Sequence, residues 1–339
     1  MNELINKIVA GDCIEILNGV KEPFADLIFA DPTFNIGYKY DKYHDKKEKE
    51  HYIDWTRQWM TACNNILKPT GSFYIAIGDD YASYVKIIAE DELKLFCRNW
   101  IIWHYTFGQQ TKNKFARSHT HIFYFVKDKK QFTFNDYAIR CPSDRQLIYN
   151  DKRANSVGKT PDDVWDSFSR VCGTFKERQL WHPCQMPELL LARIIAASSN
   201  AGDCVLDPFI GSGTTAVVAA QYGRNYCGID ISQSYVKNTI DRIANIKKQT
   251  KSNLYFNPME LTEIKRLFVE TGLGIAQLVE NNKLLEIFTK QFAIRMNPAP
   301  SKYSKKNEKE RCGVNNGKKY DAGQVMSIIK DFAGCEKRK

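Results

Sequence analysis

The sequence predicts a doubly wound α/β fold with a parallel central sheet and a functional site at the carboxyl ends of its strands. Three observations lead to this prediction. Short apolar runs of strand length alternate with runs that have apolar residues at helical spacing. A glycine-rich turn joins one strand to a helix, and acidic residues stand where several strands end.

The first half of the chain shows this alternation until about residue 127. Pro69 and Gly71 are expected to end the second of its helices. Residues 120–127 are predicted to pair antiparallel with the strand at 99–105. The other predicted strands lie at 7–12, 26–31 and 72–78, and the helices at 13–20, 51–68 and 81–90.

Residues 128–180 lose the alternation and mix aromatic, basic and turn residues. Beyond about residue 252 the pattern is helical, with a linker at 297–313. Helices are predicted at 185–199, 214–223, 233–249, 258–271, 274–296 and 322–332, and strands at 203–209 and 225–231.

The composition is that of a globular protein, 43% hydrophobic and 26% charged over 339 residues. Its best apolar run is broken by Arg193, and no secretory signal is recognised, so a cytoplasmic protein is expected. The ten cysteines include no C-x-x-C pair and do not cluster with the six histidines. We therefore expect reduced, mostly buried thiols and no metal site.

The net charge of +10 favours a polyanionic partner such as a nucleic acid. Much of this charge lies in residues 301–339, which contain 11 Lys and Arg but only 5 Asp and Glu. A basic tail is often only solvated, so charge alone does not decide the partner.

A glycine-rich turn lies in "VLDPFIGSGTTAVVAA", where Gly211 and Gly213 separate a strand ending at Asp207 from a helix. It lacks the G-K-[ST] of a phosphate loop. Ala216 stands where a dinucleotide site has its third glycine, but alanine is permitted there, so a dinucleotide site stays open as the weaker alternative. Asp230 ends the next strand and could accept both hydroxyls of a ribose. The pattern favours a nucleoside site over a purely structural turn.

A second polar cluster, "DPTFN", ends the buried strand 26–31. The exocyclic amino group of a base is a poor nucleophile, because its lone pair is delocalised into the ring. The Asp31 carboxylate and the Pro32 carbonyl could accept its two hydrogens and favour a pyramidal nitrogen. Phe34 offers a face on which a base can stack. A plain strand-to-loop turn is the alternative, since Asp, Pro and Asn are ordinary turn residues.

The chain resembles the amino-group DNA methyltransferases of the permuted β class over about residues 5–245. The resemblance rests on the order of several motifs: "GDCIEIL", "ADLIFADPTFNIG", "GSFYIAIG", "DVWD", "HPCQMPE" and "GDCVLDPFIGSGTTAVVAAQYGRNYCGIDI". It implies a Rossmann-like fold with S-adenosylmethionine as the methyl donor. The implied catalytic residues are Asp31, Pro32, Thr33 and Phe34. The implied cofactor-binding residues are Asp12, Cys13, Asp31, His182, Pro183, Cys184, Gln185, Asp207, Phe209, Gly211, Ser212, Gly213, Thr214, Asp230 and Ile231.

Three residues depart from the family pattern. Thr33 replaces the usual second proline of the tetrapeptide, and Cys184 and Met186 replace a threonine and a lysine in "HPTQKPE". A hydroxyl and a cation expected near the cofactor are therefore missing. Activity is still expected, because Asp31 and Asp230 are present along with the other main motif residues.

The acid in the tetrapeptide favours adenine-N6 over cytosine-N4 as the target. The irregular stretch 128–180 is where such enzymes carry target recognition. Residues 39–52 are either a lid over the bound base or an exposed loop. The candidate DNA-binding residues are Lys112, Lys114, Arg117, Lys152, Arg153 and Lys159.

The resemblance divides the chain into a catalytic half (1–127), a target-recognition region (128–180), a cofactor-binding half (181–250) and a helical, basic extension (251–339). The extension could contact DNA, form a homodimer or brace the core. The expected function is a sequence-specific DNA adenine methyltransferase, either solitary or with a cognate restriction endonuclease. The alternatives are cytosine-N4, RNA or protein-glutamine methylation, and a degenerate non-catalytic DNA-binding relative.

Overall fold

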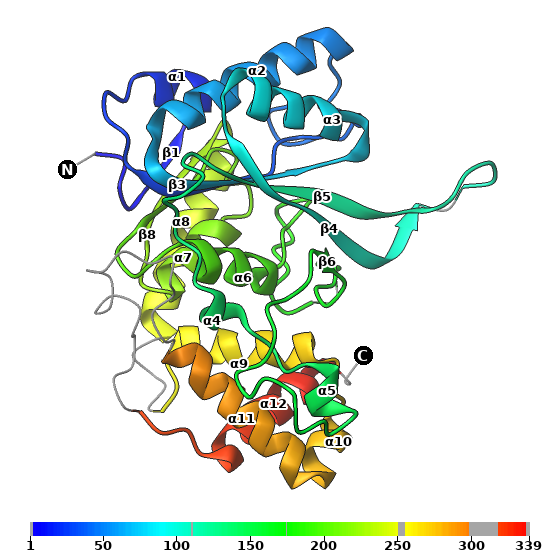
Figure 1. Cartoon of the computed structure of the whole chain (residues 1–339). Helices are drawn as coiled ribbons and strands as arrows, with labels where there is room; N and C mark the ends of the chain where they lie inside the picture. Colours follow the sequence, from blue (N-terminus) through cyan, green and yellow to red (C-terminus); the bar gives the residue numbers. More distant parts are fainter. Residues whose placement is uncertain (1–2, 110, 174, 250–254, 298–317, 337–339) are drawn as a thin grey trace.

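An eight-stranded sheet in the order β1-β8-β7-β2-β3-β5-β4-β6 forms the centre of the computed structural model (Figure 1). The structure describes residues 3–109, 111–173, 175–249, 255–297 and 318–336. In this described part β5 runs antiparallel to both of its neighbours, as predicted for residues 120–127. The strands are β1 (Lys7–Ala10), β2 (Ala25–Ala30), β3 (Leu67–Ile77), β4 (Phe96–Gln109), β5 (Arg117–Val126), β6 (Val164–Trp165), β7 (Cys204–Asp207) and β8 (Asn225–Asp230).

The order of the strands reverses between β2 and β7. From β2 the chain continues to β3 on one side, and from β7 it continues to β8 on the other. In doubly wound sheets the crevice at such a switch point binds the ligand. Asp31 directly follows β2 and Asp207 ends β7, so the two acidic turns of the sequence flank this crevice.

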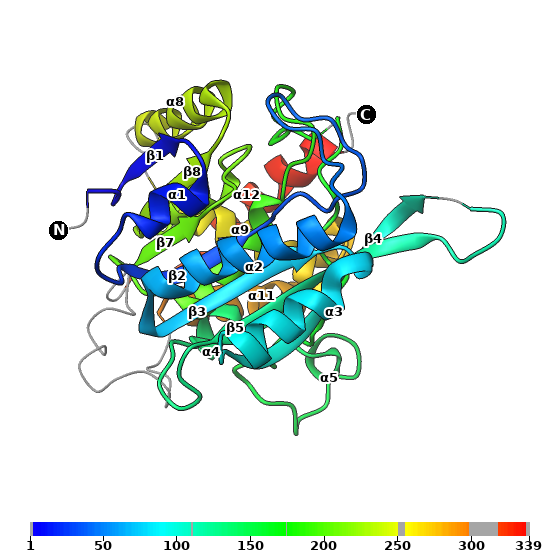
Figure 2. The ribbon, with the colours of Figure 1, turned by 90° about the horizontal axis from the view of Figure 1, so that it is seen from above.

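Helices cover both faces of the sheet (Figure 2). β2 is apolar on both sides, as a doubly covered parallel strand requires: Leu27 and Phe29 join one buried cluster, and Ile28 and Ala30 join the other. One face is covered by α1 (Cys13–Asn18), α2 (Lys49–Ile66) and α3 (Asp79–Ile87), and the other by α6 (Glu188–Ser198), α7 (Thr214–Gln221) and α8 (Gln233–Gln249).

Two predicted boundaries were wrong. Pro69 and Gly71 do not end a helix but lie inside β3, because α2 already ends at Ile66 and its last turn passes directly into the strand. The β2–β3 register shifts at this point, and such an irregularity accommodates a proline. The single helix predicted at 274–296 is two helices, α10 (Ile275–Glu280) and α11 (Asn282–Met296), because the Asn281 side chain caps the second.

The region expected to be irregular contains three short elements that its composition did not predict. They are α4 (Asp136–Ile139), α5 (Asp144–Leu147) and β6, which adds a parallel edge strand beside β4. A π-helical turn, η1 (Ile88–Glu92), extends α3. Residues 298–313 of the predicted linker lie outside the described residues.

The C-terminal helices pack on the core rather than projecting from it (Figure 1). α9 (Pro258–Thr271) contacts α6, α11 contacts α4, and α12 (Ala322–Glu336) packs on α9. Of the three roles considered for the extension, this arrangement matches a brace. We refer to α9 and α11 as the brace.

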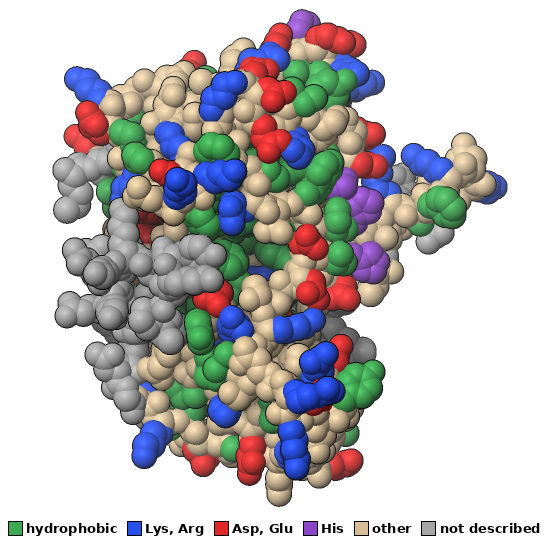
Figure 3. Space-filling model, viewed as in Figure 1, with side chains coloured by type: hydrophobic (Ala, Val, Ile, Leu, Met, Phe, Trp, Pro, Cys, Tyr) green, Lys and Arg blue, Asp and Glu red, His purple; other side chains and the backbone are tan. Residues whose placement is uncertain are grey.

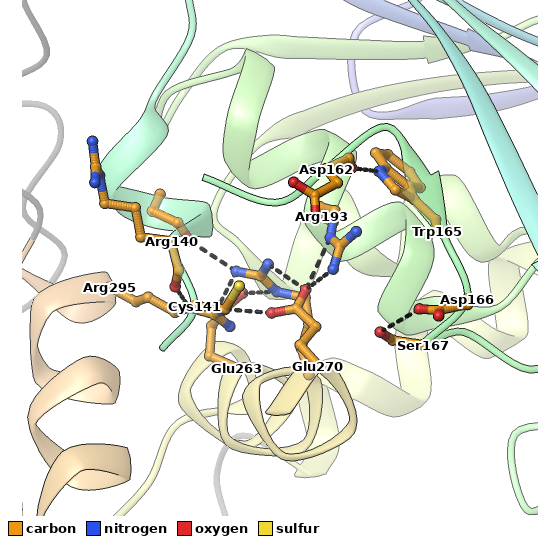
Figure 4. A network of polar contacts seen from close by, with 12 residues as sticks. Arg140, Cys141, Asp162, Trp165, Asp166, Ser167, Arg193, Glu263, Glu270 and Arg295 are labelled. Carbon is orange, nitrogen blue, oxygen red and sulfur yellow. Dashed lines mark hydrogen bonds and ion pairs between the residues drawn. The ribbon is translucent and has the colours of Figure 1, made fainter. Parts of the chain in front are cut away.

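A buried ionic network joins the brace to the core (Figure 4). Glu270 of α9 pairs with Arg193 of α6 at 2.8 Å and with Arg266 at 3.1 Å. Arg295 of α11 pairs with Glu270 and, at 3.4 Å, with Glu263. The Arg193 that breaks the apolar run in the sequence therefore belongs to a paired, buried cluster, as a charge at such a site must.

The thiols follow the prediction: the eight cysteines whose side chains the structure describes are all free, and five of them are buried. No helix in the described ranges is long and apolar enough to cross a membrane.

Candidate active site

A cavity of about 690 Å³ opens at the switch point of the sheet. The turns after β1, β2, β7 and β8 all reach it, together with residues 182–186. All of the predicted catalytic residues line it, and so do all of the predicted cofactor-binding residues except Gly213.

The tetrapeptide leaves β2 at the wall of this cavity. Asp31 is half-buried and Pro32 is buried. Burial, followed by the charge of Asp207, raises the pKa of Asp31 to about 7, while Arg170 opposes the shift. A Cβ on Gly78 would lie 3.4 Å from the ring of Phe34, so this glycine at the end of β3 leaves room for the ring.

Asn35 and Asp45 fold the following loop back onto the tetrapeptide. The Asp45 carboxylate accepts from the backbone N–H of Asn35 (2.8 Å) and of Ile36 (3.0 Å). Asn35 adopts a left-handed conformation with φ 57°, and its side-chain oxygen accepts from the Lys47 N–H at 2.6 Å. Asparagine tolerates this conformation better than most residues, which explains its place after the tetrapeptide.

The same loop closes one side of the cavity. Its Asp41 carboxylate accepts from the hydroxyls of Ser232 (2.7 Å) and Ser234 (3.1 Å), at the start of α8. Tyr38 and Tyr40 of this loop line the cavity. The loop therefore covers the site as the lid interpretation requires, although its movement stays a prediction.

The two glycines of the β7–α7 turn have different neighbours. Gly211 has φ +46°, and a Cβ there would lie 2.7 Å from Nε2 of the buried His182. Gly213 has φ +82°, and a Cβ there would lie 2.5 Å from Thr239 of α8. Gly211 therefore keeps the cavity wall open, whereas Gly213 allows α8 to pack against the turn.

Asp207 and Asp230 organise the backbone around this turn. Asp207 accepts from the Phe209 N–H at 2.9 Å and from the Thr215 hydroxyl at 2.5 Å. Asp230 accepts from the Gly211 N–H at 3.0 Å and from the Ser232 N–H at 2.8 Å. Burial raises the pKa of Asp207 to about 7 and also raises that of Asp230. Each carboxylate oxygen of Asp230 keeps a second lone pair for a ligand.

Residues 182–186 form a further part of the cavity wall. The His182 ring packs edge-on against Tyr235 at 4.8 Å, and burial lowers its pKa to about 4, so it is neutral at pH 7. The Cys184 side chain is exposed and lines the cavity. Gln185 is buried, and its side chain holds the preceding loop by accepting from Gln179 N–H and donating to Glu177 O.

Sequence reasoning missed several cavity residues. Arg170 comes from the irregular stretch 128–180, and its guanidinium lies 5.2 Å from the ring centre of Tyr105. Tyr40 and Tyr43 come from the loop after the tetrapeptide. The aromatic run "YKYDKY" directly after the tetrapeptide was a signal for the tyrosines, but no pattern in the sequence distinguishes Arg170.

The candidate DNA-binding residues fall into two groups. Arg117 lines the cavity and pairs with Asp79 and Asp80, while Lys112 and Lys114 are exposed in the adjoining β4–β5 loop. The other three do not line the cavity. Lys152 is exposed, and Arg153 and Lys159 pair with Asp151 and Asp162, each at 2.9 Å.

Comparison with known proteins gives a family and a fold. A family model described as DNA methylase matches residues 25–241. The type II methyltransferase M.HpaI of Haemophilus parainfluenzae is 37% identical over 70% of this chain and 74% of its own length. The DNA adenine methyltransferase YhdJ of Escherichia coli is 37% identical over 73% and 89%, respectively.

Solved structures show the same fold at low identity. The cytosine-N4-specific PvuII DNA methyltransferase has a TM-score of 0.55 at 17% identity, covering 84% of this chain and 92% of its own. A Thermus thermophilus protein solved in complex with S-adenosyl-L-methionine has a TM-score of 0.51 at 20% identity, covering 71% and 93%.

Proposed function

Since the chain belongs to the DNA methylase family, we propose that it transfers a methyl group from S-adenosylmethionine to the N6 amino group of adenine in a specific DNA sequence. The observation that carries this proposal is that the predicted catalytic turn and the predicted cofactor-binding turn meet at one cavity. The tetrapeptide ending β2 and the glycine turn ending β7 flank the same switch point.

The residues around the glycine turn fit the methyl donor. The missing Cβ of Gly211 leaves space beside His182, where a side chain could not be placed. Asp230 has lone pairs to accept from ribose hydroxyls, and Phe209 and Ile231 add apolar surface to the cavity. Asp12 also lines the cavity, where it would approach the adenine of the donor. When bound there, the donor supplies an electrophilic methyl group.

Asp31 and Pro32 would prepare the target amino group. The carboxylate and the carbonyl accept its two hydrogens, which turns the nitrogen lone pair toward the donor side of the cavity. Phe34 holds the flipped base by stacking. The nitrogen gives up one proton when it gains the methyl group, and a carboxylate with a pKa of about 7 can accept it.

Adenine is the proposed target because the tetrapeptide begins with Asp31 and because YhdJ, at 37% identity, is named as an adenine methyltransferase. PvuII methyltransferase acts on cytosine-N4, but at 17% identity it supports only the fold. Cytosine-N4 is therefore the alternative that the experiment must separate.

The four parts of the chain have distinct proposed roles. Residues 1–127 carry the catalytic turn, 128–180 read the target sequence, 181–250 bind the donor, and 251–339 brace the target-recognition region. M.HpaI is a type II methyltransferase, which supports a partnership with a cognate restriction endonuclease. A homodimer and a cytoplasmic location complete the proposal.

The test is methyl transfer from labelled S-adenosylmethionine to unmethylated plasmid DNA, followed by nucleoside analysis. The wild-type protein is expected to produce N6-methyladenine, whereas Asp31→Ala should lose at least about 1,000-fold in rate and still bind the donor. N4-methylcytosine would overturn the choice of base. A folded protein that binds the donor without modifying DNA would overturn DNA as the substrate.

A further inference from the structure

The hairpin formed by β4 and β5 extends far beyond the rest of the molecule (Figures 1 and 2). The core of the protein does not need this length, because none of the described side chains between Tyr105 and Thr120 is buried. In the space-filling view, basic and hydrophobic side chains lie together on this projection (Figure 3). The hairpin is thus built to reach something outside the protein.

Phe115 lies in the loop of this hairpin and is 98% exposed, more than any other large hydrophobic side chain in the described ranges. A single exposed hydrophobic residue is common on protein surfaces and needs no explanation by itself. The neighbours of Phe115 make the difference, since Lys112 and Lys114 are also exposed in this loop. An exposed aromatic ring directly after two exposed lysines fits a partner that offers both phosphates and stacked bases.

The base of the hairpin belongs to the active site. Gly108 and Arg117 line the same cavity as Asp31. A Cβ on Gly108 would lie 1.9 Å from the carbonyl oxygen of Arg117, so the two strands can meet here only because Gly108 has no side chain. Arg117 also pairs with Asp79 at 3.0 Å, which fixes the hairpin to the start of α3.

The spacing places Phe115 near the DNA position that the target base would leave. It lies two residues beyond Arg117, or roughly 7 Å at about 3.3 Å per extended residue. An adenine whose amino group reaches Asp31 must leave the base stack and enter the cavity. The gap in the duplex then lies just outside the cavity mouth, on the side from which the hairpin projects.

We propose that the β4–β5 hairpin enters the DNA duplex beside the target and that the Phe115 ring fills the space left by the flipped adenine; this rests on the proposed function. A two-stranded ribbon fits the major groove, and apolar side chains that wedge between bases offset the cost of unstacking. Lys112 and Lys114 contact the flanking phosphates.

The test compares two unmethylated DNA duplexes that contain the recognition sequence identified in the plasmid experiment. In one, the target adenine is paired with thymine; in the other, it faces an abasic site, which lowers the cost of flipping. Phe115→Ala should lose about 10- to 100-fold in kcat/KM on the paired duplex and recover most of it on the abasic one. Phe115→Trp should behave like the wild type.

Two control variants separate the wedge from simpler roles. Lys114→Ala should lower kcat/KM by the same factor on both duplexes, since phosphate contacts do not depend on the base opposite the target. Phe96→Ala removes another phenylalanine side chain, which is 42% exposed and lies at the opposite end of β4. This variant should change kcat/KM on neither duplex. Binding of S-adenosylmethionine alone should be unchanged in every variant.

Equal kcat/KM of Phe115→Ala and the wild type on the paired duplex would overturn the inference. A loss of the same size on both duplexes would overturn it as well, because Phe115 would then contribute affinity without assisting flipping. Absence of DNA methylation by the wild-type protein is a different outcome: it would overturn the proposed function and the inference together.

Discussion

The Asp31 carboxylate must be ionised to accept a hydrogen bond from the target amino group and then its proton, yet it lies in a place that disfavours charge. Burial and the nearby Asp207 raise its pKa to about 7, from an ordinary value of 3.8. A catalytic group is often kept in such an unfavourable state, because its pKa then lies close to the pH at which it works. Methyl transfer should therefore rise with pH through about 7.

Asp31→Asn should make the folded protein more stable at high pH while abolishing activity. Below about pH 4 the carboxyl group is protonated in both the folded and the unfolded wild-type protein, so the variant gains little there. Between about pH 4 and 7 the unfolded wild type releases this proton while the folded protein keeps it, so the advantage of the variant should grow across this range and level off above pH 7 at about 1–3 kcal/mol. Urea unfolding at pH 4.5 and 8 measures the difference.

The control is Asp54→Asn, which removes a carboxylate whose side chain is 62% exposed. It should change the free energy of unfolding by less than about 0.5 kcal/mol at either pH. If Asp31→Asn were as neutral as this control at pH 8, burial would not oppose the charge of Asp31.

Single residues were predictable where their chemistry is local. Asp31 and Asp230 stand where apolar strands end, and Gly211 lies in the turn after another, so their spacing along the chain was enough to place them at one edge of a sheet. Arg170 could not be predicted, because it reaches the cavity from a stretch without periodicity. Its position depends on tertiary packing that no sequence pattern of one chain displays.

At the scale of elements, the β7–α7 turn shows why its two glycines had to be distinguished by structure. Both were predicted to bind the cofactor, and both have positive φ. Only Gly211 lines the cavity, while Gly213 is required by the approach of α8. The spacing of the glycines predicts a tight turn. Which residue then approaches each glycine depends on elements that are distant in the sequence.

Gly211→Ala should therefore impair donor binding in a way that a matched glycine does not. Its Cβ would lie 2.7 Å from His182 Nε2, and either this buried ring or the turn must move. Gly202→Ala imposes a similar left-handed conformation, φ +84°, with no atom within 4 Å. Both should lose about 1–2 kcal/mol of stability, whereas only Gly211→Ala should weaken S-adenosylmethionine binding, by about tenfold or more. Calorimetric titration distinguishes them, and equal donor affinities would contradict the assignment.

At the scale of the whole molecule, the brace connects parts of the chain that the sequence left separate. Arg295 Nε donates to the carbonyl of Arg140 at 2.8 Å, and Arg266 donates to that of Ala138 at 2.8 Å. Gln291, which lies in α11 with Arg295, donates to the carbonyl oxygen of Arg140 at 3.1 Å. Residues outside the family match thus bind the backbone of residues 138–140 in the proposed target-recognition region, and Figure 4 shows Arg295 and Arg140 within this network.

The charges of the brace are compatible with burial because they are paired. Burial by itself would raise the pKa of Glu270, but Arg193, Arg266 and Arg295 together hold it well below its ordinary value. Removing one partner from such a network leaves buried charges and carbonyls without their hydrogen bonds, which typically costs about 3–5 kcal/mol. An exposed ion pair contributes much less, about 0–1 kcal/mol.

Arg295→Met should consequently lower the free energy of unfolding by about 3–5 kcal/mol. The control is Arg57→Met, since the Arg57 side chain is 40% exposed and pairs with Asp54 and Glu92. This variant should lower the free energy of unfolding by less than about 1 kcal/mol. Arg295→Met should also weaken DNA binding without changing the affinity for S-adenosylmethionine, because the brace contacts the 138–158 segment and does not line the cavity. Urea unfolding and the two binding titrations measure these effects. Equal costs for the two arginines, or a loss of donor affinity that matches the loss of DNA affinity, would mean that the extension stabilises the molecule as a whole rather than holding its target-recognition region.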